Sequence, residues 1–161
     1  MADGYPELLK SLSADEADAV LALGRGLTLL SGAVLFQLGG DADQLYIVDR
    51  GRVNLTLPMQ VFGQEQDILV EERVAGQTLG WSALIPPHRF TLKATAQLDS
   101  DLLAFPRSEL LAHFAARPRV GYAVMSNLAA TVGHRLQVFQ AMWLREMRRG
   151  LELSRGTGGA A

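Results

Sequence analysis

A short segment that opens with glycine, Gly80 to Leu84, combines residue types that suit the binding of an anion. Gly80 permits a tight turn, after which the backbone amides of Ser82, Ala83 and Leu84 are expected to form the first turn of a short helix. Unsatisfied amides at a helix start attract negative charge, and the helix dipole adds to that attraction. Two prolines follow and end the turn, because a residue before proline avoids the α region. The segment is therefore a candidate anion-binding site.

Other residue types that do chemistry are dispersed. The segment resembles a nucleophile elbow only superficially, since Leu84 stands where a second glycine is required. No carboxylate lies at a metal-ligand spacing from any of the three histidines, which are His88, His113 and His134. Asp41 and Asp43 read as turn residues, because no calcium-loop pattern follows them. We expect no enzyme activity, no metal site and no cofactor.

Composition limits the class of protein. Of the 161 residues, 48% are hydrophobic and 20% charged, which is typical of a globular domain. The net charge of -2 gives no long-range attraction for nucleic acid. The chain lacks cysteine, a signal-peptide pattern and an apolar run long enough to span a membrane. We expect a soluble, cytoplasmic protein without direct nucleic-acid or membrane partners.

The first 119 residues predict a small helix followed by a sheet-rich domain. Ser13 and Glu16 form a capping box at the start of a helix over 13–23. From about 27 to 105, short runs of alternating or β-branched residues predict strands near 33–36, 45–48, 53–57, 67–71, 90–96 and 101–105. Short glycine turns link these runs, and such links suit antiparallel pairs only. The predicted fold class is mainly β: an antiparallel, jelly-roll-like β-roll with flanking helices.

The C-terminal region predicts a long helix over 120–150, after a short helix over 108–116, and then a flexible tail over 151–161. Apolar residues recur in it every three or four positions: Val124, Leu128, Val132, Leu136, Phe139, Trp143 and Met147. We expect the first half of this stripe to pack on the β-roll. The second half lies near the chain end, and self-association would cover it.

The order of helix, β-roll and long helix resembles the cyclic-nucleotide-binding domain shared by bacterial catabolite activators and regulatory subunits of protein kinase A. The resemblance spans nearly the whole chain. The residues that carry it are Gly32, Leu35-Phe36, Gly39-Gly40-Asp41, Leu45-Tyr46-Ile47-Val48, Gly51-Arg52-Val53, Gly76, Leu79-Gly80, Ala83-Leu84, Arg89 and Ala94.

The resemblance implies that the segment from Leu79 to Ala94 is a phosphate-binding cassette for cyclic AMP or cyclic GMP. It places Arg89 at the family's phosphate-pairing arginine, whose guanidinium can meet two phosphate oxygens. Thr91 falls near the family's small polar residue beside the phosphate or base. The family's ribose-binding glutamate is replaced by Trp81, which either stacks on a ligand with help from the Ser82 hydroxyl or fills the pocket. The loop to Arg89 is also slightly shorter than the usual family spacing.

Two functions of different class remain. The first is a sensor in which a nucleotide bound at Gly80–Arg89 acts on the C-terminal helix and changes homodimer or protein-partner contacts. The second is a ligand-free interaction or dimerisation module of the same fold. We expect no helix-turn-helix domain, because too few residues follow the long helix, and we interpret Arg145, Arg148, Arg149 and Arg155 as a solvated helix end.

Overall fold

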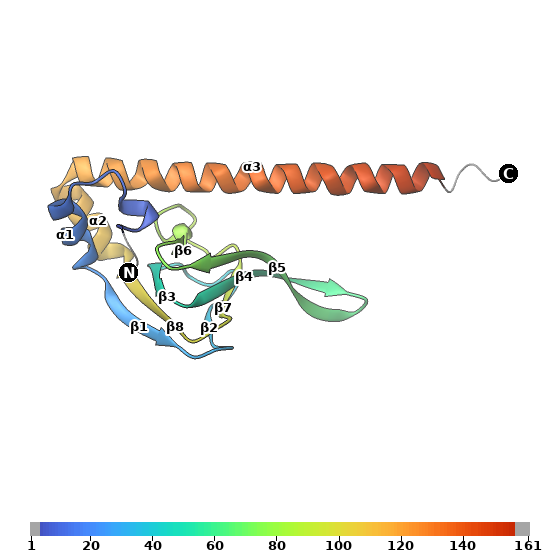
Figure 1. Ribbon diagram of the computed structural model, residues 1–161, viewed down its shortest axis with the longest axis horizontal. Helices are drawn as coiled ribbons and strands as arrows, with labels where there is room; N and C mark the ends of the chain where they lie inside the picture. Colours follow the sequence, from blue (N-terminus) through green and yellow to red (C-terminus); the bar gives the residue numbers. More distant parts are fainter. Residues whose placement is uncertain (1–3, 157–161) are drawn as a thin grey trace. The chain divides into compact units, whose positions relative to one another are not determined.

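The protein's structure, a computed structural model, describes residues 4–156, with side-chain surroundings through Glu152. It contains two four-stranded antiparallel sheets with helices before and after them (Figure 1). This arrangement confirms the predicted antiparallel β-roll and its flanking helices.

The first sheet has the order β1-β8-β3-β6 and the second the order β2-β7-β4-β5. The strands of the first are β1 (Arg25–Leu29), β8 (Ser100–Pro106), β3 (Gln44–Arg50) and β6 (Thr78–Leu79). Those of the second are β2 (Val34–Phe36), β7 (Lys93–Ala96), β4 (Arg52–Val61) and β5 (Gln64–Val74). Side chains from both sheets form the core, with Leu45, Ile47, Val53, Leu102 and Phe105 almost fully buried.

Some strands differ from the predicted ones. β1 and β6 were not predicted, since β1 is largely exposed and β6 is very short, and both depend on pairing with distant strands. β7 begins only at Lys93, because Phe90 instead exchanges hydrogen bonds with Gly39 and Gly40. β4 and β5 continue well beyond the predicted runs and form a long hairpin that extends past the other strands (Figure 1).

The N-terminal α-helix begins where its capping signal indicates, whereas the short helix before it was not predicted. A short 3-10 helix, η1 (Glu7–Leu9), precedes α1 (Ala14–Leu21), and the predicted capping box between Ser13 and Glu16 is present. Glu16 also accepts a hydrogen bond of 2.6 Å from Arg119. α2 (Arg107–Ala116) follows β8 directly.

The long C-terminal helix, α3 (Pro118–Gly156), starts earlier and ends later than predicted. Proline suits a first helical position, because its missing N–H has no acceptor there. The helix includes residues 151–156, which had been assigned to the tail, while residues 157–161 and the side chain of Arg155 lie outside the described residues. One compact unit of the chain extends to Asn127, and a second begins at Leu128.

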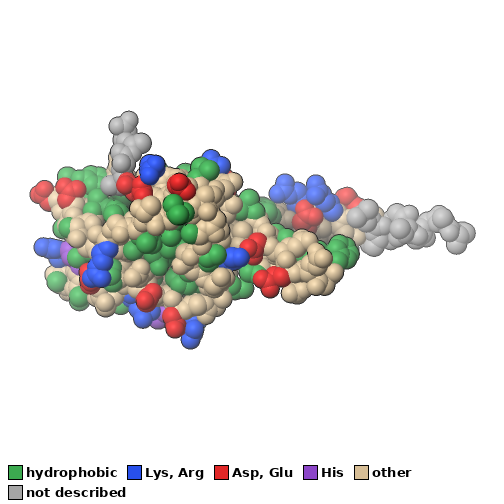
Figure 2. All heavy atoms as spheres, turned by 90° about the horizontal axis from the view of Figure 1, so that it is seen from below, with side chains coloured by type: hydrophobic (Ala, Val, Ile, Leu, Met, Phe, Trp, Pro, Cys, Tyr) green, Lys and Arg blue, Asp and Glu red, His purple; other side chains and the backbone are tan. Residues whose placement is uncertain are grey.

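The second unit is a helix with a partly apolar, exposed surface. The exposed large hydrophobic residues along it are Leu136, Val138, Phe139, Met142, Trp143, Leu144, Met147 and Leu151. Basic side chains gather near its far end (Figure 2), where the sequence places Arg145, Arg148 and Arg149. Among the described residues, no helix has the length and apolar character needed to cross a membrane.

Candidate functional site

Gly80 occupies a position that only glycine fits. Its φ is +73°, in the left-handed region, and it lies directly after β6. A Cβ atom there would lie 3.1 Å from the backbone oxygen of Gln44 and 3.1 Å from Cδ2 of Tyr46. Both the backbone conformation and the close approach of β3 therefore require glycine at the start of this turn.

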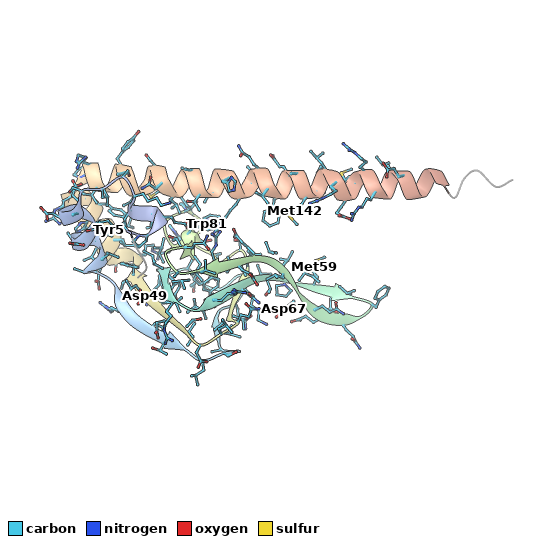
Figure 3. The ribbon with its side chains drawn as sticks, viewed as in Figure 1. Tyr5, Asp49, Met59, Asp67, Trp81 and Met142 are labelled. Carbon is cyan, nitrogen blue, oxygen red and sulfur yellow. The ribbon has the colours of Figure 1, made fainter. Side chains whose placement is uncertain are left out.

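A single turn of 3-10 helix, η2 (Trp81–Ala83), follows Gly80. Ser82, Ala83 and Leu84 are buried, whereas Trp81 is half-buried. Figure 3 labels Trp81 at this turn. The amides of Ala83 and Leu84 donate hydrogen bonds of 3.0 Å to the carbonyls of Gly80 and Trp81. Two of the three amides expected to attract an anion thus already donate within the turn.

Three aromatic rings pack beneath this turn. Phe36 and Phe90 stack with ring centroids 3.8 Å apart, and the ring of Tyr46 lies 6.0 Å from that of Phe36. Burial raises the pKa of Tyr46 to about 12, and the negative charge of Asp43 adds to the effect. The Tyr46 hydroxyl therefore stays protonated at neutral pH.

Arg89 makes its contacts with residues that precede β3. Its Nη1 lies 3.0 Å from Oδ1 of Asp41 and donates a hydrogen bond of 3.2 Å to the Gly39 carbonyl. The backbones of Asp41 and Arg89 also form an isolated antiparallel bridge. The side chains are 57% exposed for Arg89 and 81% for Asp41, so the ion pair lies in water.

His88, not Arg89, contacts the turn itself. Its Nδ1 lies 3.2 Å from the Ser82 carbonyl oxygen, and its backbone has a left-handed φ of 58°. Thr91 is exposed. Among the described residues, no hydrogen bond joins Arg89 to the 80–84 segment.

Sequence reasoning missed two features near this region. The pairing of Arg89 with Asp41 joins residues far apart in the chain, and nothing local announces it. Glu71 and Arg73 on β5 were also overlooked, although opposite charges two residues apart on a strand share a face. No group of three or more metal-ligating side chains occurs within the described part of the chain.

Comparison with known proteins identifies the fold. The model of a protein family described as "Cyclic nucleotide-binding domain" matches residues 27–117, which include the whole 80–91 region and both sheets except the first two residues of β1. The chain belongs to the cyclic nucleotide-binding domain family. The family consists of regulatory domains that bind cyclic nucleotides.

Two solved structures illustrate the likeness. The catabolite activator protein of Thermus thermophilus is 28% identical, with a TM-score of 0.68 over 92% of this chain and 63% of its own. The N-terminal domain of a transcriptional regulator from Streptomyces coelicolor is 26% identical, with a TM-score of 0.67 over 80% of this chain and 89% of its own.

One curated relative is an enzyme of greater length. Glutaminase 1 of Bradyrhizobium diazoefficiens is 30% identical over 138 residues, a match that covers 83% of this chain. The match covers only 21% of the glutaminase, so the likeness concerns a part of that protein.

Proposed function

We propose that this domain is a ligand sensor in which a cyclic nucleotide binds within the phosphate-binding cassette, at residues 80–91, and changes the contacts that α3 makes. The phosphate would lie against the turn of η2, with Arg89 released from Asp41 to pair with it. Trp81 would stack on the ligand, while Thr91 and the Ser82 hydroxyl would supply weaker polar contacts.

The observation that carries the proposal is the conformation of Gly80. A left-handed glycine, held against Gln44 and Tyr46, turns the chain tightly from β6 into η2. The Arg89–Asp41 pair supports it as well, because an exposed ion pair contributes only about 0–1 kcal/mol and yields easily to a phosphate. Releasing the Arg89 guanidinium from Asp41 to bind a phosphate therefore requires little free energy.

A second candidate function is a ligand-free interaction module, and Trp81 is the observation that favours it. Residues 80–91 contain no carboxylate to accept the hydroxyl of a ribose. The half-buried indole of Trp81 would also fill space that a ligand at this position would need. In that case the domain would serve as a dimerisation or docking unit through the exposed apolar residues of α3.

For either function we propose that α3 associates with a second copy of this chain. Its apolar residues recur every three or four positions, and Leu136, Phe139 and Trp143 are 58%, 46% and 63% exposed. That spacing is what a pair of helices needs to bury a seam between them.

A thermal-shift panel tests the sensor function. A ligand that binds only the folded form raises its stability, by about 2.7 kcal/mol at a concentration of 100 Kd. We expect cyclic AMP, cyclic GMP or a cyclic dinucleotide to raise the melting temperature. If none of them shifts the melting temperature at millimolar concentration, the interaction module becomes the better description.

Calorimetric titration then assigns the residues. Arg89→Ala should weaken binding by about 2 kcal/mol, roughly thirtyfold, and Arg89→Lys should recover part of the loss, because lysine keeps the charge but not the planar fork. Trp81→Glu should strengthen binding, since a carboxylate accepts ribose hydroxyls in charge-assisted bonds. Equal affinity for the unmodified chain and Arg89→Ala would reject this cassette as the binding site.

A further inference from the structure

Arg73 is an arginine inside the β-roll. Its side chain is only 5% exposed, and among the residues whose side chains are described it is the one buried charged residue. Removing a guanidinium from water is unfavourable unless partners compensate for the lost hydration. The surroundings of Arg73 therefore call for an explanation.

The strand register places Arg73 and Glu71 on the interior face of the sheet. Arg73 lies opposite Val53 and Glu71 opposite Leu55, and these two β4 residues are 0% and 3% exposed. Cross-strand neighbours project from the same face. Arg52 on β4 and Glu72 on β5 form a second arginine–glutamate ion pair, and their side chains are 41% and 40% exposed.

The guanidinium of Arg73 is only partly satisfied. Its Nη2 donates to the carboxylate of Glu71. Its Nε is buried and has no hydrogen-bond partner among the described residues. A buried donor without an acceptor destabilises the folded protein, and an acceptor atom supplied by a ligand would remove that cost.

Arg73 and the cassette lie on the two sides of one turn. β5 is the edge strand of the second sheet and β6 the edge strand of the first, and residues 75–77 join them. Hydrogen bonds of 2.8 and 3.0 Å between Val48 and the backbones of Gly76 and Gln77 hold this turn against β3. Gly80 follows β6 at once, so only this turn and the two residues of β6 separate the end of β5 from the start of the cassette.

We propose that Arg73 is a second ligand-binding residue and that it selects guanine over adenine. This inference rests on the proposed cyclic-nucleotide binding at residues 80–91. Guanine presents two neighbouring acceptors, O6 and N7, which match the parallel N–H groups of a guanidinium. Adenine presents a donor, the N6 amino group, where guanine has O6, and this donor would face the guanidinium unfavourably.

Glu71 makes a neutral base the better partner. Its carboxylate balances the charge of Arg73 and orients the guanidinium, which leaves a neutral pair with an unused donor. A neutral pair attracts a phosphate weakly but can still donate hydrogen bonds to the acceptor edge of a base. The phosphate contacts then remain with the cassette.

Isothermal titration of the full chain with cyclic GMP and cyclic AMP tests the inference. We expect the unmodified chain to bind cyclic GMP about tenfold more tightly than cyclic AMP, the usual size of one bidentate base contact. Arg73→Gln should reverse this order, because glutamine pairs with the N6 and N7 atoms of adenine. A purely structural role for Arg73 would not produce that reversal.

The controls separate the alternatives. Arg52→Gln removes the arginine of the exposed Arg52–Glu72 ion pair, and this variant should keep the preference for cyclic GMP. If Arg73→Gln does not fold, Arg73→Lys retains the charge beside Glu71 but lacks the planar fork, so its preference for cyclic GMP should be smaller than that of the unmodified chain. An unchanged preference in a folded Arg73 variant, or a preference of the unmodified chain for cyclic AMP, would overturn the inference alone. Failure of the unmodified chain to bind either nucleotide would overturn the proposed function and this inference together.

Discussion

Asp41 holds Arg89 on the outside of the β-roll, with 3.0 Å between Oδ1 and Nη1. The two residues are joined twice, since their backbones also form a bridge. The side-chain contact is exposed, whereas the backbone bridge fixes the position of the Arg89 backbone beside Asp41. Asp41 is thus the competitor that any phosphate at this site would have to displace.

Asp41→Asn should strengthen binding of a cyclic nucleotide by roughly threefold to fivefold, because loss of an exposed ion pair changes the free energy by up to about 1 kcal/mol. Isothermal titration would measure the change. Asp43→Asn removes the same charge from a neighbouring residue that is not paired with Arg89, so it should have a smaller effect. Equal gains in affinity for the two variants would show a general effect of removing negative charge, and would speak against a specific release of Arg89.

Gly80→Ala should lower the free energy of unfolding by at least about 1 kcal/mol more than Gly76→Ala does. Both glycines have a positive φ, at +73° and +82°, so both substitutions are strained. Only at Gly80 would the added Cβ approach neighbouring atoms, whereas Gly76 has nothing within 4 Å. Urea unfolding of the two variants measures the difference, and equal losses would remove the packing argument for Gly80.

Phe62→Asn should raise the free energy of unfolding by about 0.5–1 kcal/mol. Phe62 lies at the tip of the β4–β5 hairpin with a left-handed φ of 51° and a fully exposed side chain. Asparagine adopts this conformation more readily and, before glycine, favours the tight hairpin turn. Met59→Asn, on β4 in the same hairpin (Figure 3), is the control and should give no gain. A loss of stability in Phe62→Asn would mean that the phenyl ring is buried in solution.

Replacing Phe139 and Trp143 together by serine should convert a dimer into a monomer. These residues are 46% and 63% exposed on α3, in the second unit of the chain. Light scattering at micromolar concentration measures the mass, and far-ultraviolet circular dichroism checks that the β-roll stays folded. Tyr122→Ser, at another exposed position of α3, should leave the mass unchanged. A monomeric mass for the unmodified chain would refute self-association through this helix.

Stability should depend on Glu16 at neutral pH and much less in acid. The hydrogen bond from the Ser13 amide lowers the pKa of Glu16, and the hydrogen bond from Arg119 lowers it further. A lowered pKa in the folded state stabilises the protein above the usual glutamate value of 4.5, and this contribution disappears as the pH falls through the folded pKa. Glu16→Gln should therefore be less stable than the unmodified chain at pH 7, with the difference shrinking by pH 3.

Chemical denaturation at both pH values gives this comparison. Glu65→Gln, in the exposed part of the β4–β5 hairpin, changes the same charge without touching the Ser13–Glu16 cap. It should show no comparable dependence on pH. A loss of stability in Glu16→Gln that is as large at pH 3 as at pH 7 would contradict the expected dependence of stability on the ionisation of Glu16.

The sequence alone determined those features that depend on neighbouring residues. The capping box of Ser13 and Glu16, the antiparallel strands linked by glycine turns and the long C-terminal helix were all predicted, because backbone preferences act within a few residues. Gly80 was singled out for the same reason, and its left-handed conformation agrees.

Only the tertiary structure decided which distant residues meet. The order of strands in each sheet brought Arg89 to Asp41 and placed Arg73 beside the buried Val53. Neither relationship has a local signature, since an ion pair or a buried charge depends on side chains that folding brings together from separate strands. The sequence therefore predicted a candidate binding segment, whereas the fold revealed how Arg89 is held and which face of β5 carries Arg73.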